Sequence, residues 1–281
     1  GCNLRCVFCD LWDRPENVPT DKALRLLDQA AAIGTKVLVL TGGEPLLHPG
    51  LTDIVRHAKS RGMSVNITTN GTLVDRHLDA LVDAGVASLS FSLDGLPDTH
   101  DALRGQPGAY RRTWKQLLRT ILDGRVDTAV YFTVTNRNVR ELVPMYEAVR
   151  AAGARFDFWP VNDAKELYLT SDEDKASWLD AVTRLSKADS AGAAKAHYYA
   201  EALRYHAGEA GPMRCLGLVD QFGVTYTGDL LPCCVWGGDG LRVGNVFETP
   251  LAELWRSPEV QRHREQLWGA GCTAGCYNHS L

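Results

Sequence analysis

The first 160 residues alternate short apolar runs with longer amphipathic segments, and this alternation restricts the fold more than any other feature. The segment DKALRLLDQAAAIG has apolar residues at helical spacing and stops at Gly34, and the run KVLVL follows as a buried strand. Short connections between unlike elements imply parallel strands joined by helical crossovers. The pattern therefore predicts an α/β fold, whose strands either close into a barrel or form an open sheet. Further helices are expected near 51–61, 74–84, 110–122 and 139–152, and strands at 64–68, 87–93, 128–135 and 155–160.

The last third of the chain has a different pattern. Residues 171–206 are alanine-rich and predict two helices. The stretch LVDQFGVTYTGDLLPC predicts a β-hairpin that turns at 227–229. A helical segment follows, in which Pro258 starts a second helix.

The eight cysteines fall into two groups, with none between Cys9 and Cys215. Tight clusters in a chain of this length indicate metal binding rather than a disulfide scaffold. Cys2, Cys6 and Cys9 have the spacing CxxxCxxC, which suits three irons of one [4Fe–4S] cluster and leaves the fourth iron open. A zinc site would normally add a fourth Cys or His, and this loop contains no His. The second group is Cys215, Cys233, Cys234, Cys272 and Cys276.

The segment CNLRCVFC resembles the signature of radical S-adenosylmethionine (SAM) enzymes, CxxxCxΦC, with Phe8 in the aromatic position. TGGEP, after the expected strand 37–40, resembles a second segment of that family. The resemblance implies that the open iron chelates SAM, and that reduction of the cluster gives a 5′-deoxyadenosyl radical, which abstracts hydrogen from an unactivated carbon. It also implies a partial (β/α)6 barrel over residues 1–205, with the cluster at the C-terminal mouth of the strands and a first strand just before Gly1.

The same resemblance assigns cofactor contacts. Gly42, Gly43 and Glu44 would bind the amino group of SAM, because glycines permit close backbone approach and a carboxylate pairs with an ammonium. Ser92 would contact the cofactor, and Arg104 would pair with its carboxylate.

Three other segments have two interpretations each. Phe158 and Trp159 end the last expected strand, where the family often places adenine contacts, but a core aromatic pair explains them nearly as well. Asp94 would line the substrate space, or it is an ordinary loop charge. TTNGT, at 68–72, either lines the site or is a strand-ending Asn-Gly turn.

The tail resembles the Twitch form of the SPASM extension, which holds one auxiliary [4Fe–4S] cluster. The resemblance rests on the spacing of Cys215, Gly228 and Cys233, on VGNVFETPLAELWRSPEV and on the closing CTAGC. It implies a small second domain over residues 206–281. Its four natural ligands are Cys215, Cys233, Cys272 and Cys276, and the closing Cx3C spacing leaves open whether both of the last two bind iron.

Cys234 remains after seven ligands are counted. If the segment is extended, Cys233 and Cys234 point to opposite faces. One can then ligate the auxiliary cluster while the other faces away from it, in a direction that could include the barrel mouth. A thiol there could donate a hydrogen atom to a substrate radical, and we assign this role to Cys234. The alternatives are a buried structural cysteine and an exchanged pair, with Cys234 as the ligand.

A donor thiol determines the expected reaction. With one, the chain resembles the radical epimerases of carbohydrate antibiotics such as the neomycin C epimerase, which invert a sugar carbon. Without one, it resembles the aminocyclitol dehydrogenases, in which the auxiliary cluster accepts the second electron and a ketone forms. Ribosomal-peptide epimerases and maturases are a third possibility.

The expected partners are a small cationic carbohydrate and an external electron donor such as flavodoxin or ferredoxin. A polycation calls for carboxylates in its pocket, although solvent-exposed loop charge is the usual explanation for such residues. The net charge of −4 argues against nucleic-acid binding. The chain has no signal peptide and no apolar run of about 18 residues, so we expect a cytoplasmic protein without a membrane span. The candidate substrate carboxylates are Asp10, Asp13, Glu16, Asp94, Asp229 and Asp239.

Overall fold

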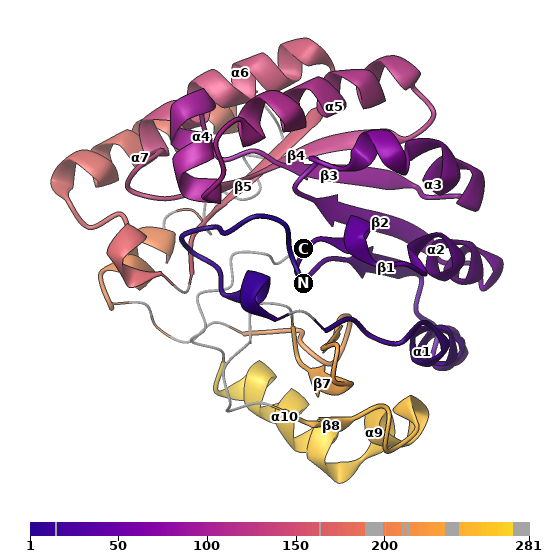
Figure 1. Ribbon diagram of the computed structural model, residues 1–281. Helices are drawn as coiled ribbons and strands as arrows, with labels where there is room; N and C mark the ends of the chain where they lie inside the picture. Colours follow the sequence, from indigo (N-terminus) through magenta and orange to yellow (C-terminus); the bar gives the residue numbers. More distant parts are fainter. Residues whose placement is uncertain are drawn as a thin grey trace.

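A curved parallel β-sheet forms the centre of the fold (Figure 1). The computed structural model describes residues 1–14, 16–162, 164–188, 199, 201–209, 211, 214–233 and 242–271. Five strands follow one another in chain order across the sheet, and every neighbouring pair is parallel. The strands are β1 (Val37–Leu40), β2 (Ser64–Thr69), β3 (Ser88–Ser92), β4 (Asp127–Val134) and β5 (Arg155–Pro160).

Helices cover the convex face of this sheet (Figure 1). The strand residues facing them are apolar and fully buried, among them Ile67, Phe91 and Phe132. Burial of these side chains against the helices stabilises the parallel sheet. The covering helices are α1 (Thr20–Ala32), α2 (Leu51–Ser60), α3 (Leu78–Ala84), α5 (Ala109–Asp123), α6 (Leu142–Ala152) and α7 (Asp172–Ala188), whereas α4 (Pro97–Arg104) packs on α5 and contacts the N-terminal loop.

The concave face of the sheet carries polar and amphipathic side chains. Side chains alternate between the two faces of a strand, and partners on neighbouring strands share a face. Val39 belongs to this face through its pairing with Asn66 and is 53% exposed, so solvent reaches the face from the β1 side. The register aligns Thr68 with Ser90, Ser92 with Tyr131, Tyr131 with Asp157 and Thr133 with Trp159.

A small antiparallel sheet forms in the C-terminal part, with the order β6 (Gly223–Val224), β7 (Asp229–Leu231) and β8 (Gly244–Asn245). Helices α9 (Leu251–Arg256) and α10 (Pro258–Gly269) follow it. This part packs against α1, where the backbone N–H of Leu251 donates to the side-chain oxygen of Gln29 at 2.6 Å. The ammonium of Lys22 also lies 4.7 Å from the centre of the Phe247 ring.

The predicted α/β fold with a parallel sheet is confirmed, as is the hairpin between β6 and β7. The segment expected as one helix over 74–84 is a 3-10 turn, Val74–Arg76, followed by α3. Helix α4 was absent from the sequence-based prediction; Pro97 starts it and Gly105, at φ +63°, ends it. None of the helices in the described ranges is both long and apolar enough to cross a bilayer.

Candidate active site at the carboxyl ends of the strands

The N-terminal loop crosses the carboxyl ends of the parallel strands on the concave side (Figure 1). The backbone N–H of Glu44 donates to the carbonyl oxygen of Gly1 at 2.9 Å, and that of Val7 donates to the carbonyl oxygen of Leu103 at 2.9 Å. A Cβ atom on Gly43 would stand 2.1 Å from the Gly1 oxygen. Glycine is therefore required at 43 by the close approach of the loop, a reason that the sequence motif alone did not reveal.

The three thiols of this loop each receive a hydrogen bond. Backbone N–H groups of Leu4 and Leu11 donate to the sulfurs of Cys2 and Cys9, both at 3.5 Å. Donors of this kind stabilise thiolates, the form that binds iron. Within the described ranges no three His, Cys, Asp or Glu side chains converge on a point where one metal ion would fit. The spacing of the three cysteines and these donors suit a cluster in which each cysteine binds a different iron.

Burial raises the pKa of Cys6, and the nearby Arg104 guanidinium opposes that effect. Burial is also the main cause that raises the pKa of Cys9. A buried thiol without a counter-charge resists ionisation, so the cation beside Cys6 favours the thiolate form there.

Glu44 is held rigidly after β1. One carboxylate oxygen accepts from the Leu46 N–H at 3.0 Å and from the Thr69 hydroxyl at 2.7 Å, and the other accepts from the Asn70 N–H at 2.7 Å. Its side chain is buried, and burial raises its pKa although these hydrogen bonds oppose the rise. A carboxylate has about four acceptor positions, so one position remains for a ligand such as an ammonium. The geometry is therefore compatible with the predicted amino-group contact.

Asn70 is a site residue that the sequence left undecided. Its side-chain amide donates to the oxygen of Asn3 at 2.8 Å and approaches the sulfur of Cys2 at 3.9 Å. The segment TTNGT thus forms the turn that ends β2, and it also contacts the cysteine loop. Both interpretations of this segment are therefore partly correct.

The two aromatic residues at the end of β5 lie on opposite faces. Trp159 is on the concave face, where its ring meets Tyr131 edge-on at 4.8 Å. Phe158 lies on the helix side, stacked on Tyr199 at 4.6 Å and edge-on to Trp178 of α7. The predicted adenine contact is corrected for Phe158, because strand alternation places it in the core. The adenine contact remains a proposal for Trp159. The predicted cofactor contact of Ser92, which shares that face, also remains a proposal.

The described part of the auxiliary site brings two cysteines close together. Cys215 and Cys233 are both buried. The N–H of Gly217 donates to the Cys215 sulfur at 3.3 Å, and a Cβ on Gly217 would lie 3.0 Å from the Pro232 oxygen, next to Cys233. The pair suits two of the four ligands of a cluster. The other predicted residues, Cys234, Asp239, Cys272 and Cys276, lie outside the described residues.

The candidate substrate carboxylates in the described ranges have different surroundings. Asp10, Asp13 and Glu16 are exposed, and Asp10 pairs with Arg14. Asp229 accepts from the Thr227 hydroxyl at 2.7 Å and pairs with Arg242 at 2.8 Å. Burial would raise the pKa of Asp229, but these contacts outweigh it and lower the pKa. Asp229 therefore stabilises the hairpin turn, which corrects the expectation that it binds substrate.

Asp94 is completely buried and forms an ion pair with Arg104. Its carboxylate therefore faces Arg104 rather than open substrate space, which corrects the sequence-based expectation for this residue. The Arg104 side chain also lies over the Phe8 ring, 5.4 Å from its centre.

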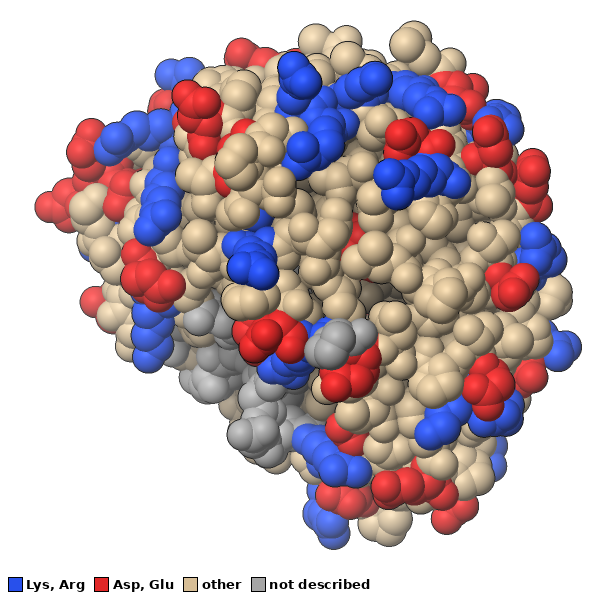
Figure 2. Space-filling model, in the orientation of Figure 1, with Lys and Arg blue, Asp and Glu red and all other residues tan. Residues whose placement is uncertain are grey.

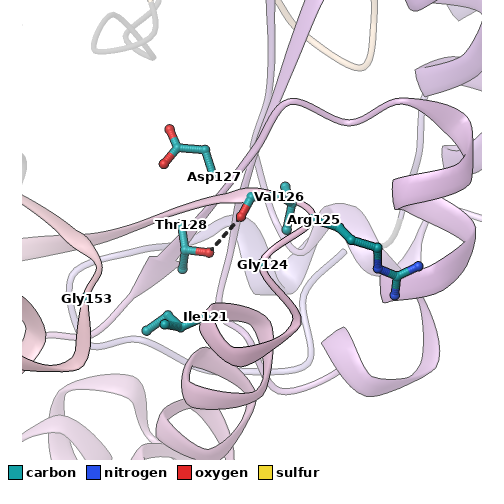
Figure 3. Close-up of a pocket in the computed structure, with 7 residues that line it drawn as sticks. All are labelled: Ile121, Gly124, Arg125, Val126, Asp127, Thr128 and Gly153. Atoms are coloured by element: carbon teal, nitrogen blue, oxygen red, sulfur yellow. Dashed lines mark hydrogen bonds between the residues drawn. The ribbon is translucent and has the colours of Figure 1, made fainter.

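A hollow of about 400 Å³ opens at the other end of the sheet, where β4 begins (Figure 3). The Arg125 side chain points away from it (Figure 3) and binds Asp123 and Asp79 instead. Figure 2 shows charges of both signs intermingled over the face seen in Figure 1, without an extended field of one sign. The hollow lies remote from the cysteine loop, so we do not assign it to the active site. It is lined by Ile121, Gly124, Arg125, Val126, Asp127, Thr128 and Gly153.

Comparison with known proteins agrees with this layout. Residues 1–149 match the radical SAM superfamily, and residues 215–277 match the SPASM iron–sulfur cluster-binding domain. The chain is 31% identical to an AdoMet-dependent heme synthase of Methanosarcina barkeri (strain Fusaro), over 99% of this chain and 89% of that protein. It is 26% identical to a PqqA peptide cyclase of Granulibacter bethesdensis, over 95% of this chain and 74% of that protein.

Among solved structures, Streptococcus suis SuiB bound to S-adenosylmethionine superposes with a TM-score of 0.71 at 18% identity. The superposition covers 94% of this chain and 63% of the SuiB chain, and at this identity it supports the fold alone. A radical SAM domain followed by a SPASM domain uses SAM and two [4Fe–4S] clusters.

Proposed function

Because this chain belongs to the radical SAM superfamily and carries a SPASM domain, we propose that it is an epimerase that inverts one sugar carbon of an aminoglycoside-type substrate. The observation that carries this choice is the polar concave face of the sheet. Thr68, Ser92 and Thr133 present hydroxyl groups there, and Asp157 adds a carboxylate. Hydroxyl-rich substrates need such hydrogen-bonding partners.

Trp159 and Tyr131 add an aromatic surface at the same place. Aromatic rings with a polar edge suit the C–H faces of a sugar ring, whereas a large apolar macrocycle would call for a mostly apolar lining. The concave face therefore favours a polyhydroxylated substrate.

The cofactors determine what chemistry is possible. When bound, SAM and the reduced cluster supply a radical that takes a hydrogen atom from an unactivated C–H bond. In our proposal Cys2, Cys6 and Cys9 hold the first cluster within a domain of residues 1–205. Cys215, Cys233, Cys272 and Cys276 hold the auxiliary cluster within a second domain of residues 206–281.

In this proposal Cys234 determines which product forms. Its thiol transfers a hydrogen atom to the substrate carbon from the face opposite to the one that lost hydrogen, and the carbon is thereby inverted. One electron and one proton then restore the thiol, and a cytoplasmic carrier such as flavodoxin or ferredoxin supplies the electron. The substrate is neither oxidised nor reduced overall, and one SAM is consumed per turnover.

A second candidate is dehydrogenation, in which an alcohol of the same polyhydroxylated substrate becomes a ketone. In that reaction no hydrogen would return to the carbon, and a cluster held by the cysteines of the second group would supply the acceptor for the second electron. A peptide substrate is the remaining alternative, since the SuiB and PqqA cyclase relatives act with peptides according to their names and titles.

Cys234→Ala separates these possibilities. For an epimerase, the variant still forms 5′-deoxyadenosine when given the substrate but yields an oxidised or quenched product instead of the epimer. Cys234→Ser is the matched control, because it keeps the size but not the weak S–H bond. Normal epimerisation by either variant would remove Cys234 as the donor.

A further inference from the structure

Arg104 lies in the last turn of α4 and contacts several groups at once. Its Nη2 lies 2.5 Å from the Oδ2 of Asp94, and its Nη1 donates to the Sγ of Cys6 at 3.6 Å. Only 8% of this residue is exposed. The guanidinium is a rigid planar fork, so the position of one arm fixes the direction of the other.

Asp94 is itself held from three directions. Its Oδ1 accepts from the backbone N–H of Thr133 at 2.8 Å, on β4. Its carbonyl oxygen accepts from the side-chain amide of Asn138 at 2.8 Å, and its N–H donates to the Nδ1 of His100 at 3.1 Å. The carboxylate therefore has little freedom to follow a moving arginine, and it instead determines where the arginine lies.

The cysteine loop also depends on this place in the fold. The backbone N–H of Arg5 donates to the carbonyl oxygen of Arg104 at 3.2 Å, and a Cβ on Gly105 would lie 2.2 Å from the Arg5 oxygen. The loop and the end of α4 are thus in tight contact. A displaced guanidinium would move relative to the Cys6 sulfur even if the loop itself stayed in place.

We propose that Asp94 is a positioning residue, which orients Arg104 so that its Nη1 donates a hydrogen bond to the Cys6 sulfur and thereby raises the reduction potential of the N-terminal cluster. Hydrogen bonds to the sulfurs are among the factors that set such potentials, because they stabilise the extra negative charge of the reduced cluster. The proposal depends on Cys6 as a cluster ligand and not on the identity of the substrate.

The test is an EPR-monitored redox titration of the reconstituted protein without substrate. The signal that changes when SAM is added belongs to the N-terminal cluster, and the other signal reports the auxiliary cluster. Asp94→Asn keeps the shape but removes the charge that holds Arg104. We expect the midpoint potential of the N-terminal cluster to become more negative, with the auxiliary potential unchanged.

Asp98→Asn is the matched control, because Asp98 is an exposed residue of the same helix, and it should leave both potentials at their wild-type values. Arg104→Lys keeps a cation but cannot reach Asp94 and Cys6 together, so it should shift the potential in the same direction as Asp94→Asn. Wild-type potentials in both Asp94→Asn and Arg104→Lys would overturn the proposal.

A measurement on the wild-type chain protects the test against a variant that fails to fold. With ¹⁵N-labelled arginine, pulsed EPR of the reduced N-terminal cluster should show hyperfine coupling to a guanidinium nitrogen. Arg104→Lys should abolish that coupling. No nitrogen coupling in the wild type, or an unchanged coupling in Arg104→Lys, would contradict the hydrogen bond to Cys6.

Discussion

His100 makes the fold sensitive to acid, and the effect can be worked out from its surroundings. The imidazole is fully buried in α4, and burial, with a smaller contribution from Arg104, lowers its pKa to about 3 from 6.5. The Nδ1 atom accepts the backbone N–H of Asp94, so the folded protein holds the neutral ring. Below pH 6.5 the unfolded chain therefore binds a proton at this residue that the folded chain does not bind. The free energy of unfolding consequently decreases as the pH falls towards 3.

The size of the effect follows from the two pKa values. Between pH 7.5 and 5.5, proton linkage at this one group removes about 1.4 kcal/mol from the free energy of unfolding. For a chain of this length that corresponds to a decrease of roughly 3–5 °C in the melting temperature. His100→Asn keeps an acceptor for the Asp94 N–H but cannot titrate, so its pH-dependent loss should be smaller than that of the wild type by this amount.

The assay is anaerobic thermal unfolding of the reconstituted protein at the two pH values, followed by circular dichroism. The pH-dependent change is compared between variants, because His100→Asn also loses the edge contact with Tyr110 at both pH values. His263→Asn is the control, since His263 is partly exposed on α10 and should behave like the wild type. An equal decrease in wild type and His100→Asn would refute the reasoning.

Three further predictions concern the clusters. Replacing Cys2, Cys6 or Cys9 by Ala should abolish 5′-deoxyadenosine formation, and continued formation would contradict the assignment of this loop. Gly43→Ala should expel the N-terminal loop, because its Cβ would meet the Gly1 oxygen at 2.1 Å; Gly269→Ala has open space around it and should behave as wild type. The wild type should contain about eight irons per chain, as two four-iron clusters require, and Gly43→Ala about four; eight in the variant would show that the loop tolerates the methyl group.

Helices and strands whose apolar residues recur at a regular spacing were predictable from the sequence. Apolar runs separated by amphipathic helices predicted the parallel sheet. Strand positions that face the helices are buried and therefore apolar, as at Ile67 and Phe132. Motifs whose chemistry depends on local spacing, such as Cys2, Cys6 and Cys9, were also predictable.

Contacts between distant segments were not predictable. Asp94 resembled a substrate residue in the sequence, but the partners that bury it, Thr133 and Asn138, come from a later part of the chain. Phe158 and Trp159 are adjacent in sequence, and only the register of β5 shows which of them faces the helices. Asn70 became a site residue through contact with the N-terminal loop, which no local pattern encodes.

The proposed reaction is tested most directly by turnover in D₂O with candidate aminoglycosides, analysed by mass spectrometry and NMR. A thiol exchanges its hydrogen with solvent, so our account predicts one deuterium at a single inverted carbon and one 5′-deoxyadenosine per epimer formed. A ketone or other oxidised product without solvent deuterium would contradict epimerisation and identify a dehydrogenation instead.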